Sequence, residues 1–419
     1  MVSNRWINKT VGELIKFEGG SQPPRDTFNF EPKEGYVRLL QIRDYKTDKF
    51  KTYIPIHLAR KFCDETDIMI GRYGPPIFQI LRGLRGAYNV ALIKAIPNEE
   101  NVSKDYVYYY LKQDALFELI DSLSQRTSGQ TGIDMEALKS YPFPLPPKDE
   151  QRKIVSILSS VDKTIEKTKA IIEQTEKMKK GLMQQLFTKG IGHTIFKKTE
   201  FGEIPEEWEV VGIIDIAENE KNAVKPGPFG SSLKKEFYVK SGFKVYGQEQ
   251  VIANDFTIGD YYIDDKKYEE LNGFKVKPLD LLISLVGTFG KIAVIPKLQF
   301  KPGIINPRLL KVTFDKSKAN VHFYKYYMSS SSFYQQLEGM SQGGTMGVIN
   351  SKILKSIHFP LPPLDEQLRI IDILTNIDHK LNIETSKYRR LQVLKKGLMQ
   401  SLLTGKVRVK VDETEVTQV

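Results

Sequence analysis

The chain has 419 residues, of which 40% are hydrophobic and 11% aromatic, and its formal net charge is +11 at pH 7. This length favours two or three domains with substantial hydrophobic cores. No apolar run reaches the roughly 18 to 20 residues that span a bilayer, and the N-terminus has no signal-peptide pattern, so we expect a cytoplasmic protein. A single cysteine, Cys63, excludes an internal disulfide framework and a multi-cysteine zinc site, while the basic charge favours a polyanionic partner.

The two tryptophans of the chain begin two similar halves. Trp6 and the eight residues after it resemble the segment that starts at Trp208. In the first half, short strands are expected at 36–42, 67–71 and 90–96, followed by a helical pattern at 104–123. In the second half, strands are expected at 243–246, 279–285, 292–295 and 309–314, followed by a helical pattern at 322–337. A loop rich in Ser, Gln, Gly and Thr comes next in both halves, at 124–131 and 341–346.

Each half then continues into a repeated segment of fixed length. FPLPPKDEQ at 143–151 returns as FPLPPLDEQ at 359–367, and KKGLMQ at 179–184 returns at 395–400. Pro144 corresponds to Pro360 and Lys179 to Lys395, an offset of 216 in both cases. No residue is gained or lost between these anchors, although the residues between them differ. Constant length with a variable surface is typical of a spacer.

A long helix is predicted in each spacer. Consecutive prolines set a rigid extended start, and Asp149 or Asp365 can cap the helix that follows. Apolar residues recur near a 3.5-residue period, at Ile154, Leu158, Val161, Ile165, Ile172, Leu182 and Leu186, and at Ile370, Leu374, Ile377, Leu381, Tyr388, Leu398 and Leu402. Helices of roughly 36 to 40 residues need a partner for this stripe, so we expect the two to pack on each other. Dimerisation between two chains is the alternative.

The pattern therefore predicts two tandem α/β (α+β) domains separated by two long antiparallel coiled-coil helices, with pseudo-two-fold symmetry. The expected boundaries are a globular domain at 1–143, a helix at 144–190, a second globular domain at 191–358 with a linker at 191–205, a helix at 359–407 and a tail at 408–419. The sequence contains neither a methyltransfer motif like Asn-Pro-Pro-Tyr nor a phosphate-cradling GxxxxGK[ST] motif. The five histidines lie near no carboxylate cluster. We expect no catalysis by this chain and no metal site.

The sequence carries clearer signals for nucleic-acid binding than for catalysis. Glycine-rich segments lie early in both halves, at 19–25 and 225–234, where backbone N–H groups and polar side chains suit phosphate contacts. Arginine reads guanine, and Asn or Gln reads adenine, in the major groove. The predicted DNA-contacting residues are Ser21, Gln22, Arg25, Arg72, Tyr73, Arg82, Arg85, Asn89, Gln125, Arg126, Lys225, Phe229, Ser231, Ser232, Lys234, Thr288, Lys291, Asn306, Arg308, Gln342 and Thr345.

A second set of residues is predicted to face partner subunits or the joint between a domain and its helix. These residues belong to the two repeated motifs: Asp149, Glu150, Gln151, Lys180, Gly181, Asp365, Glu366, Gln367, Lys396 and Gly397. A role limited to capping and ending the helices is the alternative for them.

The repeated spacer resembles one family closely. Two variable segments, each followed by Pro-Leu-Pro-Pro-x-Asp-Glu-Gln and a long helix that carries Lys-Lys-Gly-Leu-Met-Gln, look like the specificity subunit of type I restriction–modification enzymes. The resemblance covers nearly the whole chain. The segments 227–232, 287–291 and 306–309 are also similar to recurrent pieces of that family's recognition domains, whereas the glycine segment at 19–24 is a poorer match.

The resemblance implies that each domain reads one half of a bipartite DNA site and that the helices set a fixed unread gap. Two methyltransferase subunits would dock on the helices and use S-adenosylmethionine to methylate adenine N6, and restriction subunits would add ATP- and Mg-dependent cleavage. This chain would recognise the DNA target sequence. The alternatives are a helical scaffold that binds nucleic acid nonspecifically, and an enzyme whose active site leaves no recognisable motif.

Overall fold

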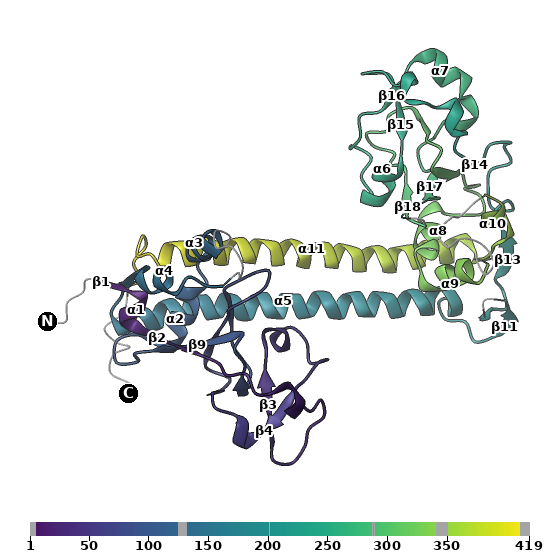
Figure 1. The fold of residues 1–419 in the computed structure, drawn as a ribbon. Coiled ribbons are helices and arrows are strands. Elements are labelled where there is room, and N and C mark those ends of the chain that lie inside the picture. The colour runs from purple at the N-terminus through teal and green to yellow at the C-terminus, as the bar shows by residue number, and fades with distance from the viewer. Residues whose placement is uncertain are drawn as a thin grey trace. The chain divides into compact units, whose positions relative to one another are not determined.

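The computed structural model of this protein describes residues 6–124, 132–200, 202–286, 288, 290–340 and 351–410. The chain forms two compact units. Unit 1 contains Met1–Lys169 and Ser386–Val419, and unit 2 contains Ala170–Thr385. Two long helices, α5 (Lys148–Lys189) and α11 (Leu364–Leu402), are each continuous (Figure 1). Each unit therefore holds one domain, the beginning of one long helix and the end of the other, as two α/β domains with a coiled coil require.

Unit 1 is built on two four-stranded sheets. One has the order β2-β9-β6-β7 and the other β4-β3-β8-β5. Their strands are β2 (Ile15–Gly19), β3 (Tyr36–Leu40), β4 (Tyr53–Pro55), β5 (Phe62–Cys63), β6 (Ile68–Gly71), β7 (Gln79–Leu81), β8 (Gly86–Tyr88) and β9 (Leu92–Pro97). Four short helices complete the domain: α1 (Val11–Leu14), α2 (Lys104–Leu111), α3 (Asp114–Ser124) and α4 (Met135–Ser140).

Unit 2 has a four-stranded sheet, β14-β20-β17-β18, a three-stranded sheet, β16-β15-β19, and a small hairpin, β11-β12. Their bounds are β11 (Phe196–Thr199), β12 (Gly202–Pro205), β14 (Val224–Pro226), β15 (Phe243–Tyr246), β16 (Tyr262–Ile263), β17 (Leu281–Ser284), β18 (Ile292–Val294), β19 (Gly303–Ile305) and β20 (Leu309–Val312). The short helices are α6 (Gln248–Ala253), α7 (Asp265–Glu270), α8 (Val321–Met328), α9 (Ser331–Met340) and α10 (Ser351–Ser356).

Every strand expected from the sequence is present, but each predicted helical pattern is broken in two. Residues 104–123 form α2 and α3, and residues 322–337 form α8 and α9. Neither break contains proline or glycine. Polar side chains bond the backbone at both breaks instead: the Gln113 amide donates to the Tyr110 carbonyl (3.0 Å), and the Ser330 hydroxyl accepts from the Phe333 N–H (3.4 Å). Such local hydrogen bonds compete with a continuous helix.

The tryptophan segments and the proline runs pair with each other. In unit 1, β1 (Ile7–Thr10) runs antiparallel to β10 (Pro142–Leu145). In unit 2, β13 (Glu209–Gly212) runs antiparallel to β21 (His358–Leu361) in the same manner. Prolines are tolerated because each of these sheets has only two strands, so that their missing N–H groups break no central ladder. Each proline run therefore joins its helix to the strand that follows the tryptophan of its own unit.

The apolar stripe of the long helices is most deeply buried near the domains. Ile154, Leu158, Ile370 and Leu374 have no exposed surface, whereas the stripe positions Val161, Ile165, Ile172, Leu381 and Tyr388, nearer the middle of the helices, are half-buried. In each unit the two fully buried residues belong to the same hydrophobic core as the domain. The domains therefore cover much of the stripe that the sequence assigns to helix-on-helix packing alone. No helix among the described residues is long and apolar enough to cross a membrane.

Candidate nucleic-acid interface

In unit 2, three loops meet at one edge of the sheet β14-β20-β17-β18. They follow β14, join β17 to β18, and lead from β19 into β20. The Gly227 N–H donates to the Leu309 carbonyl (2.8 Å), and the Leu285 N–H donates to the Arg308 carbonyl (2.9 Å). A Cβ on Gly227 would lie 1.9 Å from the Asn306 carbonyl oxygen, so this close approach requires glycine. We call these three loops the loop edge of unit 2.

Unit 1 repeats this arrangement with the loops that follow β2, β6 and β8. The Gly20 N–H donates to the Leu92 carbonyl (3.0 Å), and the Arg72 N–H donates to the Ala91 carbonyl (2.8 Å). A Cβ on Gly20 would lie 2.0 Å from the Asn89 carbonyl oxygen. These loops form the loop edge of unit 1, and the two glycine segments identified in the sequence hold equivalent places in it.

Most residues predicted to contact DNA lie on or beside the two loop edges. Phe229 is 87% exposed although it is large and apolar. The other exposed members of the set are Gln22, Arg25, Arg72, Ser231, Lys234, Thr288, Lys291 and Arg308, and the half-buried ones are Ser21, Tyr73, Lys225 and Ser232. An exposed aromatic ring among hydroxyl and cationic side chains suits stacking, wedging and phosphate contacts with nucleic acid.

Arg82 and Arg85 lie elsewhere. Arg82 follows β7, at the end of that strand away from the loop edge, and its guanidinium donates to the Thr66 carbonyl (3.2 Å) and pairs with Asp105. The guanidinium also lies 4.7 Å from the centre of the Tyr108 ring. Arg85 precedes β8, again away from the loop edge. The structure therefore does not bring these two residues to the loop edge with the others, because strand direction puts them at the other end of their strands; Arg82 is also bonded within unit 1.

Asn89 and Asn306 shape the loop edges from within. Asn89 Oδ1 accepts from the Ala91 N–H (3.1 Å), and Asn306 Oδ1 accepts from the Arg308 N–H (2.9 Å). The sequence assigns them to base reading, but these amide oxygens hold their own turns. Four further predicted residues, Gln125, Arg126, Gln342 and Thr345, lie outside the described residues.

Other side chains, which the sequence did not single out, support the loop after β17. The Tyr334 hydroxyl donates to the Gly290 carbonyl (2.7 Å), and the Gln248 amide donates to the Val286 carbonyl. Tyr334 is 44 residues from Gly290 in the chain and lies inside a helical pattern. No local sequence signal marks such a contact, because only the folded domain brings the two residues together.

Comparison with known proteins identifies the family. Residues 4–177 and 205–395 match the model of the type I restriction modification DNA specificity domain. The chain belongs to this family. It is 29% identical to the type I restriction enzyme MjaVIII specificity subunit of Methanocaldococcus jannaschii, over 98% of this chain and 94% of that protein. It is 34% identical to the putative MjaX specificity subunit of the same organism, over 80% of this chain and 74% of that protein.

Solved structures support the fold of this specificity-domain protein. The S subunit from M. genitalium aligns with a TM-score of 0.56 at 15% identity, over 96% of this chain and 97% of that one. A chain solved in work on complex assembly and conformational transition of the type I R-M system aligns with a TM-score of 0.59 at 16% identity, over 97% of this chain and all of that one. The family resemblance predicted from the repeated motifs is confirmed.

In this specificity-domain protein the repeated Gln is buried at each helix root, by which we mean 142–151 in unit 1 and 358–367 in unit 2. Gln151 Oε1 accepts from the Ser103 N–H (2.8 Å), and its amide donates to the carbonyls of Asn101 and Pro146. Gln367 makes the same set of bonds: it accepts from Asn320 and donates to Lys318 and Pro362. Each glutamine therefore ties the loop before a domain helix to the start of a long helix.

The repeated Glu is buried beside it. The Trp6 indole N–H donates to Glu150 (2.8 Å), and Arg408 adds a charged contact of 2.7 Å. Burial raises the pKa of Glu150, but the hydrogen bonds from Arg408 and Trp6 outweigh it, so the net shift of the pKa is downward. The predicted tail, 408–419, thus begins with residues that are fixed to unit 1.

In unit 2, Glu366 takes the equivalent place with different partners. The Trp208 indole N–H donates to it at 2.8 Å, and a ring nitrogen of His193 lies 2.9 Å from it. Glu366 also accepts from the Ile191 N–H (2.8 Å). Both tryptophans that open the two halves therefore reach a helix root.

The motif residues that were predicted to face partners or the domain joint fall into a buried group and a more exposed group. Glu150, Gln151, Glu366 and Gln367 are buried inside the chain, so they hold the joint and cannot present their side chains to a partner. Asp365 is exposed and Asp149 half-exposed, and each pairs with an arginine of its own helix, Arg369 or Arg152. The remaining four, Lys180, Gly181, Lys396 and Gly397, are exposed.

Residues of the repeated KKGLMQ motif line a similar groove in each unit. In unit 1, Lys395 pairs with Asp162 (2.6 Å), which also accepts from the Tyr109 hydroxyl (2.9 Å). This groove, of about 680 Å³, is lined by Asp162, Ile165, Lys395, Lys396, Met399 and Gln400 among others. We call it the lysine groove of unit 1.

The lysine groove of unit 2 repeats these contacts. Lys179 pairs with Asp378 (2.5 Å), which accepts from the Tyr326 hydroxyl (2.7 Å). Burial, with Asp378 beside it, raises the pKa of Tyr326 to about 12. The groove has a volume of about 380 Å³ and is lined by Lys179, Lys180, Met183, Gln184, Ser331 and Leu381 among others. One contact differs between the two grooves. In unit 1, Lys396 pairs with Asp114 (2.7 Å), the first residue of α3 after the helix break. In unit 2, the first residue after the break is the uncharged Ser331, which begins α9.

Proposed function

We propose that each loop edge reads one half of a bipartite DNA site and that α5 and α11 fix the unread gap between the halves. The observation that carries this proposal is the repetition of the loop edge in both units. In each edge, a turn whose close backbone approach requires glycine lies beside exposed cationic side chains, such as Arg72 in unit 1 and Arg308 in unit 2. Two readers are redundant unless each addresses its own half-site.

The long helices suit a spacing role because they are continuous and rooted. α5 has 42 residues and α11 has 39. At 1.5 Å per residue each is roughly 60 Å long. A flexible linker would lose the register between half-sites, whereas helices joined to the domains by buried bonds preserve it. Base discrimination then adds over both halves, at about 1 to 3 kcal/mol for each good bidentate contact.

The chemistry would belong to partner subunits. Two methyltransferase subunits, carrying S-adenosylmethionine, would flip and methylate adenine at N6, and restriction subunits with ATP and Mg would cleave. This chain would recognise the DNA target sequence and carry out no catalysis. We place the methyltransferase docking sites at the two lysine grooves.

The glycines that follow the groove-lining Lys180 and Lys396 in sequence support that placement. Gly181 and Gly397 lie inside long helices, where glycine costs roughly 1 kcal/mol relative to alanine. A Cβ on either would meet no atom of this chain within 4 Å, so the fold of the chain does not require glycine there. The same exposed Lys-Gly pair nevertheless occurs in both units. Close approach of another polypeptide accounts for both glycines.

A binding selection from randomised duplex DNA tests the proposal. The chain is co-purified with its methyltransferase partner and the selection is run near 150 mM salt. The expected result is two short fixed blocks around a constant unread gap. An enriched pool with no motif would favour the nonspecific helical scaffold instead, and cofactor- or metal-dependent turnover by the isolated chain would favour an enzyme.

A further inference from the structure

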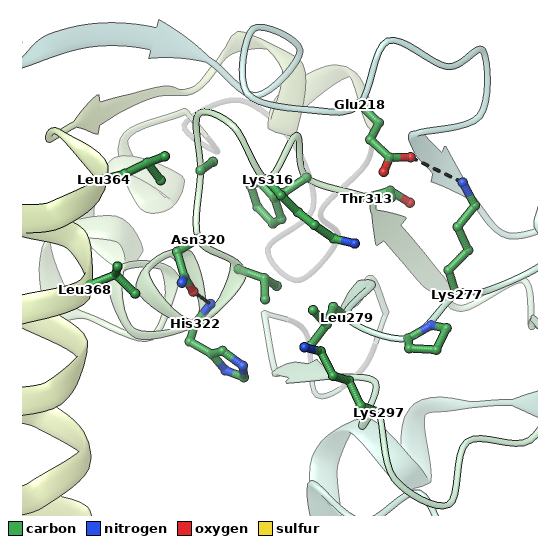
Figure 2. A pocket seen from close by; sticks show the side chains of 14 residues that line it. Glu218, Lys277, Leu279, Lys297, Thr313, Lys316, Asn320, His322, Leu364 and Leu368 are labelled. Atoms are coloured by element: carbon green, nitrogen blue, oxygen red, sulfur yellow. Dashed lines mark hydrogen bonds and ion pairs between the residues drawn. The ribbon is translucent and has the colours of Figure 1, made fainter.

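Unit 2 contains a pocket of about 850 Å³ that neither the loop edge nor the lysine groove includes. It lies where β20 ends and β17 begins, which is the edge of the sheet opposite the loop edge. The first turns of α11 form one side of it. Figure 2 shows Lys297 and Lys316 reaching toward its centre, with Leu364 and Leu368 on the helix. We call it the opposite-edge pocket.

The cations of this pocket have few counter-charges. Lys277 is paired with Glu218 (3.2 Å) and Glu220 (2.8 Å). Lys297 and Lys316 make no ion pair or hydrogen bond with any residue that the structure describes, and both are exposed. Carboxylates of a second molecule can pair with both.

Apolar side chains line the same pocket as these cations. Leu364 and Leu368 are four residues apart on α11, so they share one face of the helix. Leu368 is 50% exposed, and Phe314 and Leu279 also line the pocket. An apolar ridge along a helix, with cations on one side, is the surface that an acidic amphipathic helix covers.

The equivalent corner of unit 1 is built differently. Gln151 and Gln367 bond equivalent loops, which places Glu99 where unit 2 has Lys316 and Asp105 where it has His322. Lys148 and Arg152 occupy the positions of Leu364 and Leu368.

Three of those charged side chains have partners inside unit 1. Lys148 donates to the Glu99 carbonyl, Arg152 pairs with Asp149, and Asp105 pairs with Arg82. The two cations of this corner of unit 1 thus have partners within the unit, its Glu99 carboxylate is exposed, and the corner lacks the leucine ridge. The opposite-edge pocket therefore distinguishes the two units.

We infer that the opposite-edge pocket binds an acidic, leucine-bearing helix of a methyltransferase subunit. Because the equivalent corner of unit 1 has Lys148 and Arg152 in place of the two leucines, and Glu99 in place of Lys316, one of the two methyltransferase copies binds this chain more tightly than the other. This inference rests on the proposed function, since it assumes that a copy docks on each unit. Leucine side chains of the partner would cover Leu364 and Leu368, and its carboxylates would pair with Lys297 and Lys316.

Titration of the purified full chain with purified methyltransferase subunit tests the inference. Native mass spectrometry gives the stoichiometry and calorimetry gives the two dissociation constants. The wild-type chain should bind two copies with dissociation constants that differ at least tenfold. The double variant Lys297→Glu with Lys316→Glu should weaken the tighter site at least tenfold and leave the weaker one unchanged.

Two further variants separate the pocket from general charge and folding effects. Lys240→Glu with Lys266→Glu changes the charge of unit 2 equally at exposed positions outside the pocket, and it should leave both constants unchanged. Leu368→Lys changes only the half-exposed ridge and should also weaken the tighter site.

The possible failures are distinguishable. Two equal sites in the wild-type chain, or unchanged binding by the double variant, would overturn the inference and leave the proposed function intact. Displacement of the subunit from the tighter site by inorganic phosphate or ATP would assign the pocket to a small anion and also overturn it. Absence of any complex would remove the proposed docking and this inference together.

Discussion

The two units build the same turn before their central strands, but they satisfy its aspartate differently. Asp67 precedes β6, and its carboxylate accepts from the Asp64 N–H (3.0 Å) and pairs with Lys94 (2.5 Å) and Lys104 (3.0 Å). In unit 2, Asp280 accepts from the Lys277 N–H (2.7 Å) in the matching turn. Its other bond is to a neutral group, the Thr313 hydroxyl (2.6 Å).

The pKa shifts of these two aspartates are opposite as a result. Burial raises the pKa of Asp67, but its lysine partners and a backbone N–H reverse the shift and hold the pKa below its ordinary value. Burial also raises the pKa of Asp280, and there the hydrogen bonds do not reverse it. The backbone turn and the helix roots are thus common to both units, while the charges at the domain edges are not. Substitutions in the shared features should therefore have equal effects in the two units. Substitutions of the edge charges should have unequal effects.

The largest expected effect is at the helix roots. Replacing Gln151 or Gln367 with leucine leaves one buried N–H and two carbonyls without partners in either unit. At about 1 to 3 kcal/mol for each unsatisfied group, each variant should lose roughly 3 kcal/mol or more. Urea unfolding measures this loss. The exposed Gln174→Leu variant on the same helix is the control, and a loss confined to one unit would contradict the equivalence of the roots.

DNA binding should separate Arg308 from Arg82. Arg308→Ala removes an exposed guanidinium from a loop edge and should weaken binding to the selected site by about 1 to 3 kcal/mol, or roughly 5- to 150-fold. Arg82→Ala should change DNA affinity little, because this side chain bonds Thr66 and Asp105 within unit 1. Fluorescence anisotropy at fixed salt compares them. Equal losses would place Arg82 in the interface.

The two aspartates predict opposite stability effects near pH 7. Asp67→Asn removes two ion pairs and should cost about 1 to 2 kcal/mol. Asp280→Asn can keep both hydrogen bonds and removes a buried charge, so it should be neutral or slightly stabilising. A depressed pKa stabilises the fold above the unfolded value and a raised pKa destabilises it there, so stability changes from the two residues have opposite signs as pH rises. Parallel pH–stability curves for the two variants would refute this contrast.

The smallest expected effect concerns Glu150 and Arg408. Because the pKa of Glu150 is held below its ordinary value of 4.5, its stabilising contribution is complete above that pH and is lost as the pH falls through the lower, folded value. Arg408→Met should reduce this loss in the acid range. Lys410→Met, in the same segment, should not alter the acid limb of the unfolding curve; an equal change in both variants would assign the effect to net charge.

The sequence predicts the long helices and the central strands because periodicity and proline carry those signals locally. It also locates the glycine segments of the loop edges. It does not predict the helix breaks at Gln113 and Ser330, because neither break contains proline or glycine, the residues that mark a break in a sequence. Nor does it predict that Glu150 meets Arg408, a contact across 258 residues that arises only on folding.

The side chains of the candidate interface were only partly predictable for a related reason. Residue type suggested that Arg82, Asn89 and Asn306 read bases. Strand direction decides which end of a sheet Arg82 occupies, and the turn geometry decides where the two asparagine amides point. Neither property can be read from residue identity alone.

The spacing role of α5 and α11 is most directly tested by shortening both. Removing residues 166–172 and 382–388 deletes seven residues, one heptad, from equivalent positions, so the apolar stripe stays in register. Each helix then loses about 10 Å, which is close to three base pairs of DNA. In the binding selection, the two fixed blocks should be unchanged and the gap between them roughly three base pairs shorter. The same blocks at the same spacing would show that these helices do not set the gap.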